Sequence, residues 1–262
     1  MTNDNLTVEE RLAKAKQPGI DAMILHKYYG GKIETVPKAA VRNFSDFAIW
    51  YSPGVAEPCK AINKNVDDAY AHTCKWNMVA VVSDGTRVLG MGDIGPEAAM
   101  PVMEGKSMLF KYLGGVDSVP ICLDTKDPEK IIETVKLIAP SFGGINLEDI
   151  SMPKCFDILD RLRKECKIPV WHDDQQGTAT VEVAGAINAL KIVGKKINEA
   201  NLCLVGAGAA NIAIARLLLG TGFNPKNLCM VDSKGILNLE REEIKNTFKQ
   251  KWEICQKTDG AG

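Results

Sequence analysis

The sequence predicts an α/β fold in two parts, residues 1–176 and residues 177–262. Short, nearly continuous apolar segments alternate with helical segments, which is typical of a parallel sheet with helices on both faces. In the second part, the turn Gly206-Ala207-Gly208 closes an apolar segment and opens a helix. In the first part, the acidic pairs Glu148-Asp149 and Asp173-Asp174 follow apolar segments. These observations define the fold class and point to the ends of the strands as the place where function lies.

The N-terminal segment predicts two helices. Thr7 with Glu10 forms a capping-box pattern, so a helix starts there, and we expect it to end before Pro18. A second helix is expected at residues 22–29, where Gly30 and the glycine after it stop it.

The rest of the first part should contain a regular alternation of strands and helices. The expected strands are residues 78–83, 88–91, 119–123, 144–147 and 169–171, and the expected helices are residues 105–113, 128–139 and 153–166. From Thr178 a long helix of small residues leads into the second part. Strand 202–205, helix 209–219, strand 228–231 and a polar helix from about Glu240 follow, and no further strand is expected before the end.

Composition restricts the partners and the compartment. Of the 262 residues 45% are hydrophobic and 25% charged, and the net charge of −1 gives no reason to expect a nucleic acid or an anionic membrane as partner. The N-terminus has no apolar signal core, and the apolar runs are only strand-sized, so we expect a cytoplasmic protein. No two cysteines form a CxxC pair, and we expect buried thiols of a reducing compartment. The eight cysteines are Cys59, Cys74, Cys122, Cys155, Cys166, Cys203, Cys229 and Cys255.

The two acidic pairs predict a site for a hard divalent cation, Mg²⁺ or Mn²⁺, because such ions prefer carboxylate oxygens. The alternative is that Asp149 or Asp173 only caps the helix that follows it. His172 adjoins the second pair, and we expect it to support the site or the core rather than to bind a metal directly. Ligands of parallel α/β sheets bind outside the carboxyl ends of the strands, which favours the metal site.

The glycine turn predicts a dinucleotide site. Gly206 and Gly208 would allow a tight turn and close approach of a pyrophosphate, with Ala207, Ala209 and Ala210 completing the binding segment. The third position of the fingerprint, usually glycine or alanine, is Asn211.

The end of the next strand bears on the choice of nucleotide. Asp232 lies at the spacing of a carboxylate that binds the adenosine ribose, which favours NAD. Ser233 and Lys234 could accept a 2′-phosphate, so both NAD and NADP remain open.

Seven segments together resemble the malic enzymes, particularly their compact prokaryotic form: IWYSPGVAEPC, SDGTRVLGMGDIG, PVMEGKSMLFK, VPICLDT, LEDI, HDDQQGTA and VGAGAAN. They occur in the family's order and span nearly the whole chain. The resemblance implies oxidative decarboxylation of (S)-malate to pyruvate and CO₂ with NAD or NADP and Mg²⁺ or Mn²⁺, by a homodimer. It also makes the first part the substrate- and metal-binding domain and the second a partial Rossmann-type domain.

The resemblance assigns the metal to Glu148, Asp149 and Asp174, and a place in the cofactor site to Thr178. A cation held there would chelate malate and act as a Lewis acid. Asp173 is expected to bind and orient Lys106.

Three further roles follow from the resemblance. Lys106 would bind substrate and act as the base at the C2 hydroxyl, with a pKa lowered by burial and a cation. Tyr51 would be the acid that protonates C3 of enolpyruvate, and Arg87 would hold a substrate carboxylate. The alternatives are a wall residue fixed by Pro53 for Tyr51, a solvated helix lysine for Lys106, and a structural ion pair for Arg87.

Only 30 residues follow Asp232, whereas a complete Rossmann-type domain runs well over about 100 residues with about six strands. We therefore expect a family member truncated by about a third, or a fragment, relative to the size such a domain needs. Two alternatives to oxidative decarboxylation stay open. One is an incomplete fragment that folds and binds metal and a dicarboxylate, and the other is malolactic conversion of malate to lactate.

Overall fold

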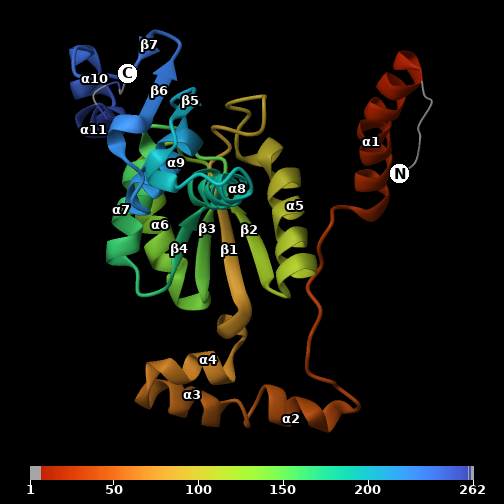
Figure 1. Cartoon of the computed structure of the whole chain (residues 1–262). Coiled ribbons are helices and arrows are strands. Elements are labelled where there is room, and N and C mark those ends of the chain that lie inside the picture. The colour runs from red at the N-terminus through yellow and green to blue at the C-terminus, as the bar shows by residue number, and fades with distance from the viewer. Residues whose placement is uncertain (1–6, 259, 261–262) are drawn as a thin grey trace.

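A computed structural model describes residues 7–258 and residue 260 (Figure 1). Expectations for residues 1–6 and for the C-terminal residues 259, 261 and 262 lie outside this described part. The helices are α1 Val8–Tyr29, α2 Phe47–Trp50, α3 Ala56–Lys64, α4 Ala69–His72, α5 Pro96–Gly114, α6 Pro128–Ile138, α7 Lys154–Glu165, α8 Thr178–Ile192, α9 Ala209–Gly220, α10 Glu242–Thr247 and α11 Lys249–Thr258. The strands are β1 Met78–Ser83, β2 Asp117–Cys122, β3 Gly144–Leu147, β4 Val170–His172, β5 Leu202–Val205, β6 Leu228–Asp232 and β7 Gly235–Ile236.

The first sheet has four strands in the order β2-β1-β3-β4, and all its pairs are parallel. Alternation along the strands sorts side chains between the two faces. Val81 packs with Met103 on the face that α5 covers, whereas Ala80, Val82 and Leu147 belong to the core beneath α6 and α7. Figure 1 shows α5 on one side of the sheet and α6 and α7 on the other. The expected sheet with helices on both faces is confirmed.

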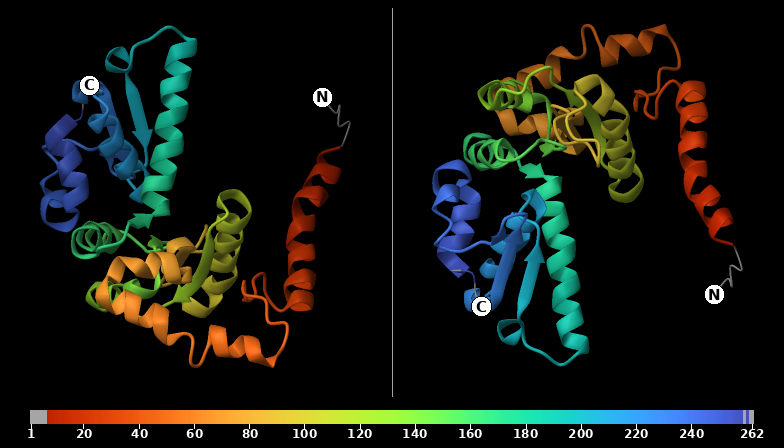
Figure 2. Two further views of the ribbon diagram at one scale, coloured as in Figure 1. Left: turned by 90° about the horizontal axis from the view of Figure 1, so that it is seen from below. Right: turned by 90° about the horizontal axis from the view of Figure 1, so that it is seen from above.

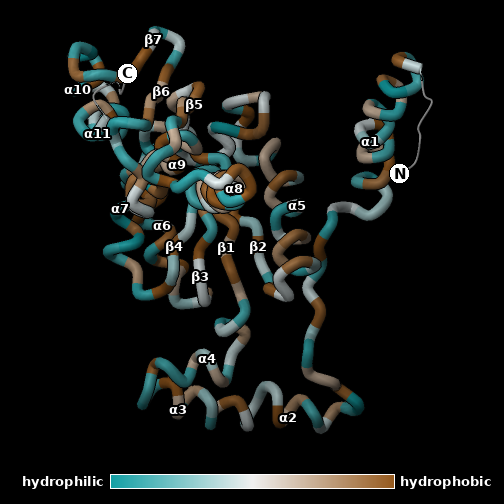
Figure 3. The backbone as a smooth tube through the Cα atoms, in the orientation of Figure 1, coloured by the Kyte–Doolittle hydropathy of each residue, from teal (hydrophilic) through white to brown (hydrophobic). Residues whose placement is uncertain are grey.

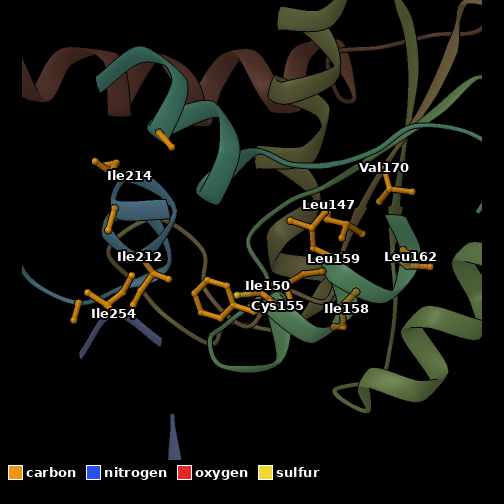
Figure 4. Packing of buried hydrophobic residues seen from close by; sticks show 14 of the residues in the cluster. Leu147, Ile150, Cys155, Ile158, Leu159, Leu162, Val170, Ile212, Ile214 and Ile254 are labelled. Carbon is orange, nitrogen blue, oxygen red and sulfur yellow. The ribbon is translucent and has the colours of Figure 1, made fainter. Parts of the chain in front are cut away.

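A single apolar core joins the two parts of the chain. Leu147 and Leu159 of the first sheet and α7 belong to the same buried cluster as Ile212 of α9 and Ile254 of α11. Figure 4 shows Leu147 and Leu159 on one side of this cluster and Ile212 and Ile254 on the other. Because the interface is apolar and continuous, the carboxyl ends of the first sheet are held next to the second part.

The second sheet is small. Its order is β5-β6-β7, with β5 and β6 parallel and the two-residue β7 antiparallel to β6. The strand β7 contradicts the expectation of no further strand, because two residues carry too little pattern to be recognised in sequence. Val205 of β5 is 80% exposed, and Cys203 of the same strand is also exposed. One face of this sheet therefore carries solvent-exposed side chains.

The segment from α1 to α4 forms an arm that projects from the two sheets. Figure 2 shows α1 standing beside the body of the molecule, and no residue of α1 is buried. Figure 3 shows apolar and polar residues mixed along it. Its exposed apolar side chains include Leu12, Ile20, Met23, Ile24 and Tyr28. An exposed apolar helix of this size indicates a surface that another element covers.

Other local expectations were wrong as well. The two expected N-terminal helices are one, because α1 continues through Pro18 between a complete capping box at Thr7 and a left-handed Gly30. A proline removes one helical hydrogen bond, and well-capped ends offset that loss. Residues 88–91 form a turn with an isolated bridge between Val88 and Gly92 rather than a strand.

Helix α5 starts at Pro96, well before residue 105, because a proline is tolerated in the first turn of a helix.

All eight cysteines are free, but Cys59, Cys74 and Cys203 are exposed, so the expectation of buried thiols holds for only part of the set. Among the described residues, no helix is long and apolar enough to cross a membrane.

Candidate active site

Three carboxylates converge where β3 and β4 end. Glu148 and Asp149 directly follow β3, and Asp174 lies in the short π-helical turn after β4. Oxygen atoms of all three lie within 4.8 Å of one another. The backbone N–H of Asp149 donates to Asp174 Oδ2 at 2.8 Å, and Asp149 has a left-handed φ of 54°. An unusual backbone conformation at a buried carboxylate is typical of a functional site.

The electrostatics of this cluster suit a cation. Burial, and then the charge of Asp174, raises the pKa of Asp149 to about 6. Burial is also the largest cause for Glu148, whose pKa rises to about 7 although Lys106 opposes the rise. The buried Oδ2 atom of Asp149 has no hydrogen-bond partner among the described residues. A divalent cation would supply the missing partner and the missing positive charge, so these three carboxylates fit Mg²⁺ or Mn²⁺.

The capping alternative does not match the observed contacts. The N-cap of α7 is Pro153 and that of α8 is Gly177, and neither helix has a side-chain cap. Asp173 instead accepts hydrogen bonds from Lys106 and from the Trp171 indole, at 2.6 and 3.3 Å.

Lys106 extends from α5 to the carboxylates. Its Nζ lies 2.6 Å from Asp173 Oδ2 and 3.1 Å from Glu148 Oε1. Glu148 reaches it because alternation along β3 places Glu148 on the α5 face, together with Asn146, whose amide donates to Glu148 at 2.8 Å. Lys106 is therefore not a solvated helix lysine.

The Lys106 pKa is raised by the protein's own groups, contrary to the expected lowering. Burial lowers that pKa, but the hydrogen bond that Lys106 donates to Asp173 and the charge of Glu148 outweigh burial and raise it. The two carboxylates that contact Lys106 stabilise its charged form, whereas the expected lowering depended on burial and a cation.

Arg87 lies on the loop after β1. The loop turns at Gly85, where φ is 67° and a Cβ would lie 2.2 Å from the carbonyl oxygen of Gly95, so only glycine fits. The Arg87 backbone N–H donates to the Asp149 carbonyl at 2.9 Å. Its side chain is exposed, donates to the Leu89 carbonyl at 3.0 Å, and forms no ion pair in the described part of the chain. Arg87 is thus free to bind an anion.

The glycine turn opens α9 next to this loop. Gly206 has φ of 97°, and Gly208 has no atom within 4 Å of the place where a Cβ would lie. The unusual Asn211 has a structural reason, because its amide donates to the carbonyls of Val205 and Gly206 at 2.9 Å each. These bonds stabilise the turn. In the usual dinucleotide-binding fingerprint, a glycine or alanine at this position instead allows close packing of helix and strand.

One cavity of about 470 Å³ connects the two sets of residues. Its lining includes Arg87, Glu148, Asp149, Asp174, Thr178, Gly208, Ala209 and Ala210. Lys106 and Asp173 lie behind Glu148 and do not line it, and neither do Gly206, Ala207 and Asp232. The carboxylate cluster and the N-terminus of α9 therefore face the same space.

His172 is completely buried beneath the cluster. Its Nδ1 lies 3.5 Å from Asp174 Oδ2, and neither ring nitrogen has a hydrogen-bond partner among the described residues. Burial lowers its pKa despite the neighbouring aspartates. The position agrees with a supporting role.

Asp232 ends β6 and pairs with two basic side chains that no sequence pattern singled out. Arg241 Nη1 lies 3.2 Å from it and Lys251 Nζ lies 3.0 Å from it. Burial opposes ionisation, but hydrogen bonds from Arg241, the Lys234 backbone and Lys251 hold the Asp232 pKa well below its usual range. Arg241 directly precedes α10 and Lys251 lies in α11. Both segments are rich in charged residues, so no sequence motif marks these two as partners of Asp232.

Tyr51 is not brought to the cavity within this chain. It is 73% exposed at the end of α2. Figure 1 shows α2 to α4 beyond the amino ends of the strands, whereas the carboxylates follow the opposite ends. The catalytic role expected for Tyr51 therefore stays a prediction, and within one chain Tyr51 does not meet Lys106. The position of Tyr51 depends on where the N-terminal arm lies relative to the sheet, and no local sequence pattern encodes that arrangement.

A parallel α/β sheet with three converging carboxylates at its strand ends, joined through one core to a glycine turn that opens a helix, is the architecture of a two-part α/β protein with a dinucleotide-binding second part. Residues 30–163 match the family described as "Malic enzyme, N-terminal domain", and residues 175–259 match "Malic enzyme, NAD binding domain". The chain belongs to the malic enzyme family.

Curated relatives and solved structures agree. The chain is 55% identical over 229 residues to the bifunctional malic/malolactic enzyme of Bacillus subtilis, covering 87% of this chain and 55% of that protein. It is 56% identical over 225 residues to the NAD-dependent malic enzyme of Geobacillus stearothermophilus, covering 86% and 46%. The crystal structure of Entamoeba histolytica malic enzyme superposes with a TM-score of 0.90 at 48% identity, covering 96% and 54%. The chain thus spans about half the length of these relatives.

Proposed function

We propose that this chain carries the metal and substrate site of an enzyme that oxidatively decarboxylates (S)-malate to pyruvate and CO₂ with NAD or NADP. One observation carries the proposal: the carboxylate triad and the start of α9 line one cavity of about 470 Å³. Malate offers two carboxylates and a hydroxyl, which match a cation and Arg87. The division at residues 1–176 and 177–262 remains a prediction within this proposal.

Glu148, Asp149 and Asp174 would hold Mg²⁺ or Mn²⁺, since their carboxylate oxygens converge at the cavity and two of the three residues are buried. When bound, such a cation supplies Lewis-acid stabilisation of negative charge at the substrate oxygen. Arg87 binds and orients a malate carboxylate, for which its exposed guanidinium is suited.

Lys106 takes the proton from the C2 hydroxyl, and a dinucleotide bound at the glycine turn would supply the hydride acceptor. Asp173 orients Lys106 through their 2.6 Å contact. Release of the Lys106 proton requires that its raised pKa fall, and positive charge added at Glu148 acts in that direction.

The nucleotide would bind over the turn Gly206–Gly208 with Ala207, Ala209 and Ala210 alongside it and Thr178 opposite. Asp232 would bind the adenosine ribose. Its two basic neighbours reduce the negative charge that normally excludes a 2′-phosphate, so this site has reason to accept both NAD and NADP.

Tyr51 would act in a homodimer, as the acid for C3 of enolpyruvate in the cavity of a second copy. Its exposure and its distance from the carboxylates of its own chain support this arrangement. An apolar groove of about 850 Å³ between α1 and α5, lined by Leu25, Tyr29 and Met108 among others, offers a surface for the second copy. Eight free thiols suit a reducing compartment, and we place the protein in the cytoplasm.

The test is turnover of malate with NAD and with NADP, each with and without Mn²⁺, on the protein that contains these residues. Metal-dependent formation of pyruvate with reduction of the nucleotide supports oxidative decarboxylation. Lactate without net reduction would identify malolactic chemistry, which the name of the Bacillus subtilis relative makes the second candidate. Mn²⁺ binding without turnover would identify the incomplete fragment.

A further inference from the structure

A buried ion pair lies outside the cavity, between the end of β1 and the start of α7. The Asp84 side chain is fully buried and pairs with Lys154 Nζ, whose side chain is 17% exposed. Lys154 is the first residue of α7, where a positive charge is unfavourable because the helix dipole is positive at that end. The carboxylate of Asp84 offsets this unfavourable interaction, and the ion pair connects the end of β1 to the start of α7.

The second carboxylate oxygen of Asp84 continues the connection. Asp84 Oδ1 accepts hydrogen bonds from the Thr86 backbone at 3.1 Å and from the Thr86 hydroxyl at 2.6 Å. The Thr86 hydroxyl oxygen in turn accepts from the Ser151 backbone N–H at 2.9 Å. Lys154 also donates to the Lys126 carbonyl at 3.2 Å. Asp84 therefore fastens the loop after β1 to the segment between β3 and α7.

These two segments carry two groups of the site. Arg87 follows Thr86 directly, and Asp149 precedes Ser151 by two residues. Their backbones meet in the 2.9 Å hydrogen bond from Arg87 to the Asp149 carbonyl. Asp149 needs support, because a non-glycine residue with φ of 54° is held there only by its surroundings.

We propose that Asp84 and Lys154, acting through Thr86, are positioning residues that hold Asp149 and Arg87 in register in the cavity. Neither Asp84 nor Lys154 lines the cavity, so they act only through the residues they hold. Taking Asp149 as a metal ligand rests on the proposed function. Residues that orient metal ligands from behind typically change metal affinity by about 10–100-fold when removed.

The Thr86 hydroxyl provides the sharpest test. Thr86→Val keeps the shape and the ion pair but removes the hydroxyl that joins Asp84 to Ser151, whereas Thr86→Ser keeps it. Lys154→Met leaves Asp84 buried without its charge partner, and Lys154→Arg restores a cation. Lys136→Met is the control, since it breaks an ion pair of 2.6 Å with Glu165 that lies between the surfaces of α6 and α7.

The measurement is Mn²⁺ affinity without substrate, by the paramagnetic resonance signal of free Mn²⁺, under conditions where denaturant titration shows each variant folded. Thr86→Val and Lys154→Met should bind Mn²⁺ about tenfold more weakly, while Thr86→Ser, Lys154→Arg and Lys136→Met should match the parent protein. Should Lys154→Met not fold, the Thr86 variants decide, because their ion pair is intact.

Four results would overturn the inference. Loss of stability in Thr86→Val with unchanged Mn²⁺ affinity would show that the link only stabilises the fold. Equal weakening in Lys136→Met would show a general effect of lost ion pairs. A parent protein that binds no Mn²⁺ would refute the proposed metal site itself, and with it this inference, whereas normal binding in the parent and in all variants would refute only the positioning role.

Discussion

Lys106 Nζ and Asp173 Oδ2 lie 2.6 Å apart, although the two residues are 67 positions apart in the sequence. The contact exists because α5 covers the face of the sheet to which Glu148 also points. It gives Lys106 one orientation, and that orientation underlies the first prediction.

Replacing Lys106 with alanine should abolish malate oxidation while largely sparing decarboxylation of added oxaloacetate. Only the first half-reaction needs a base at the C2 hydroxyl, and loss of a general base typically costs about 10²–10⁴-fold. Stopped-flow measurement of nucleotide reduction, beside CO₂ release from oxaloacetate, separates the two steps. Lys111→Ala is the matched control, since Lys111 lies on the same helix, 58% exposed, and pairs with Asp117 instead. Equal slowing of both half-reactions would refute the assignment.

Asp174→Ala should lose Mn²⁺ binding while the fold survives. The variant leaves a cation with two carboxylates, which lowers the negative charge of the site. It also removes the acceptor of the Asp149 backbone N–H, which helps to hold Asp149 in place. Isothermal titration with Mn²⁺ measures the loss, and circular dichroism checks the fold. Asp160→Ala, at an exposed position of α7, should bind Mn²⁺ normally. Near-normal affinity in Asp174→Ala would remove Asp174 from the site.

Mn²⁺ affinity should weaken as the pH falls below about 7. Burial and the charge of Asp174 raise the pKa of Asp149 to about 6, and burial raises that of Glu148 to about 7. A carboxyl with a raised pKa keeps its proton to higher pH, and the cation must displace that proton. Displacing one proton costs about tenfold in affinity per pH unit below the pKa. Titrations at pH 6, 7 and 8 test this, and a pH-independent dissociation constant would contradict it.

Mixing two inactive variants should restore activity if Tyr51 acts in a second copy. Tyr51→Phe and Lys106→Ala homodimers each lack one group at both sites, whereas a mixed dimer has one site with both. Random exchange into closed symmetric dimers would recover about a quarter of the parent activity. Turnover after subunit exchange is the measurement, and a mixture of two Lys106→Ala preparations is the control. No recovery despite proven exchange would show either that Tyr51 and Lys106 of the same subunit act together or that Tyr51 is not the acid at C3.

Much of the fold followed from local sequence patterns. The strand at residues 144–147 agrees with β3 at both ends, and the glycine turn opens α9 as expected. These elements were predictable because short apolar runs, capping residues and glycines act on neighbours in sequence. The errors at Pro18 and at residues 88–91 occurred where the same local signals are weak or compensated.

The sequence by itself determined that Glu148, Asp149 and Asp174 would follow two strands of a parallel sheet, because the order of elements places strand ends at one edge. Only the tertiary structure decided that Lys106 meets Asp173, that Asp232 is held by Arg241 and Lys251, and that Tyr51 lies away from the cavity of its own chain. These relationships depend on how helices pack on the sheet and where the N-terminal arm lies. Such packing is set by contacts between residues far apart in sequence, which leave no periodic pattern along the chain.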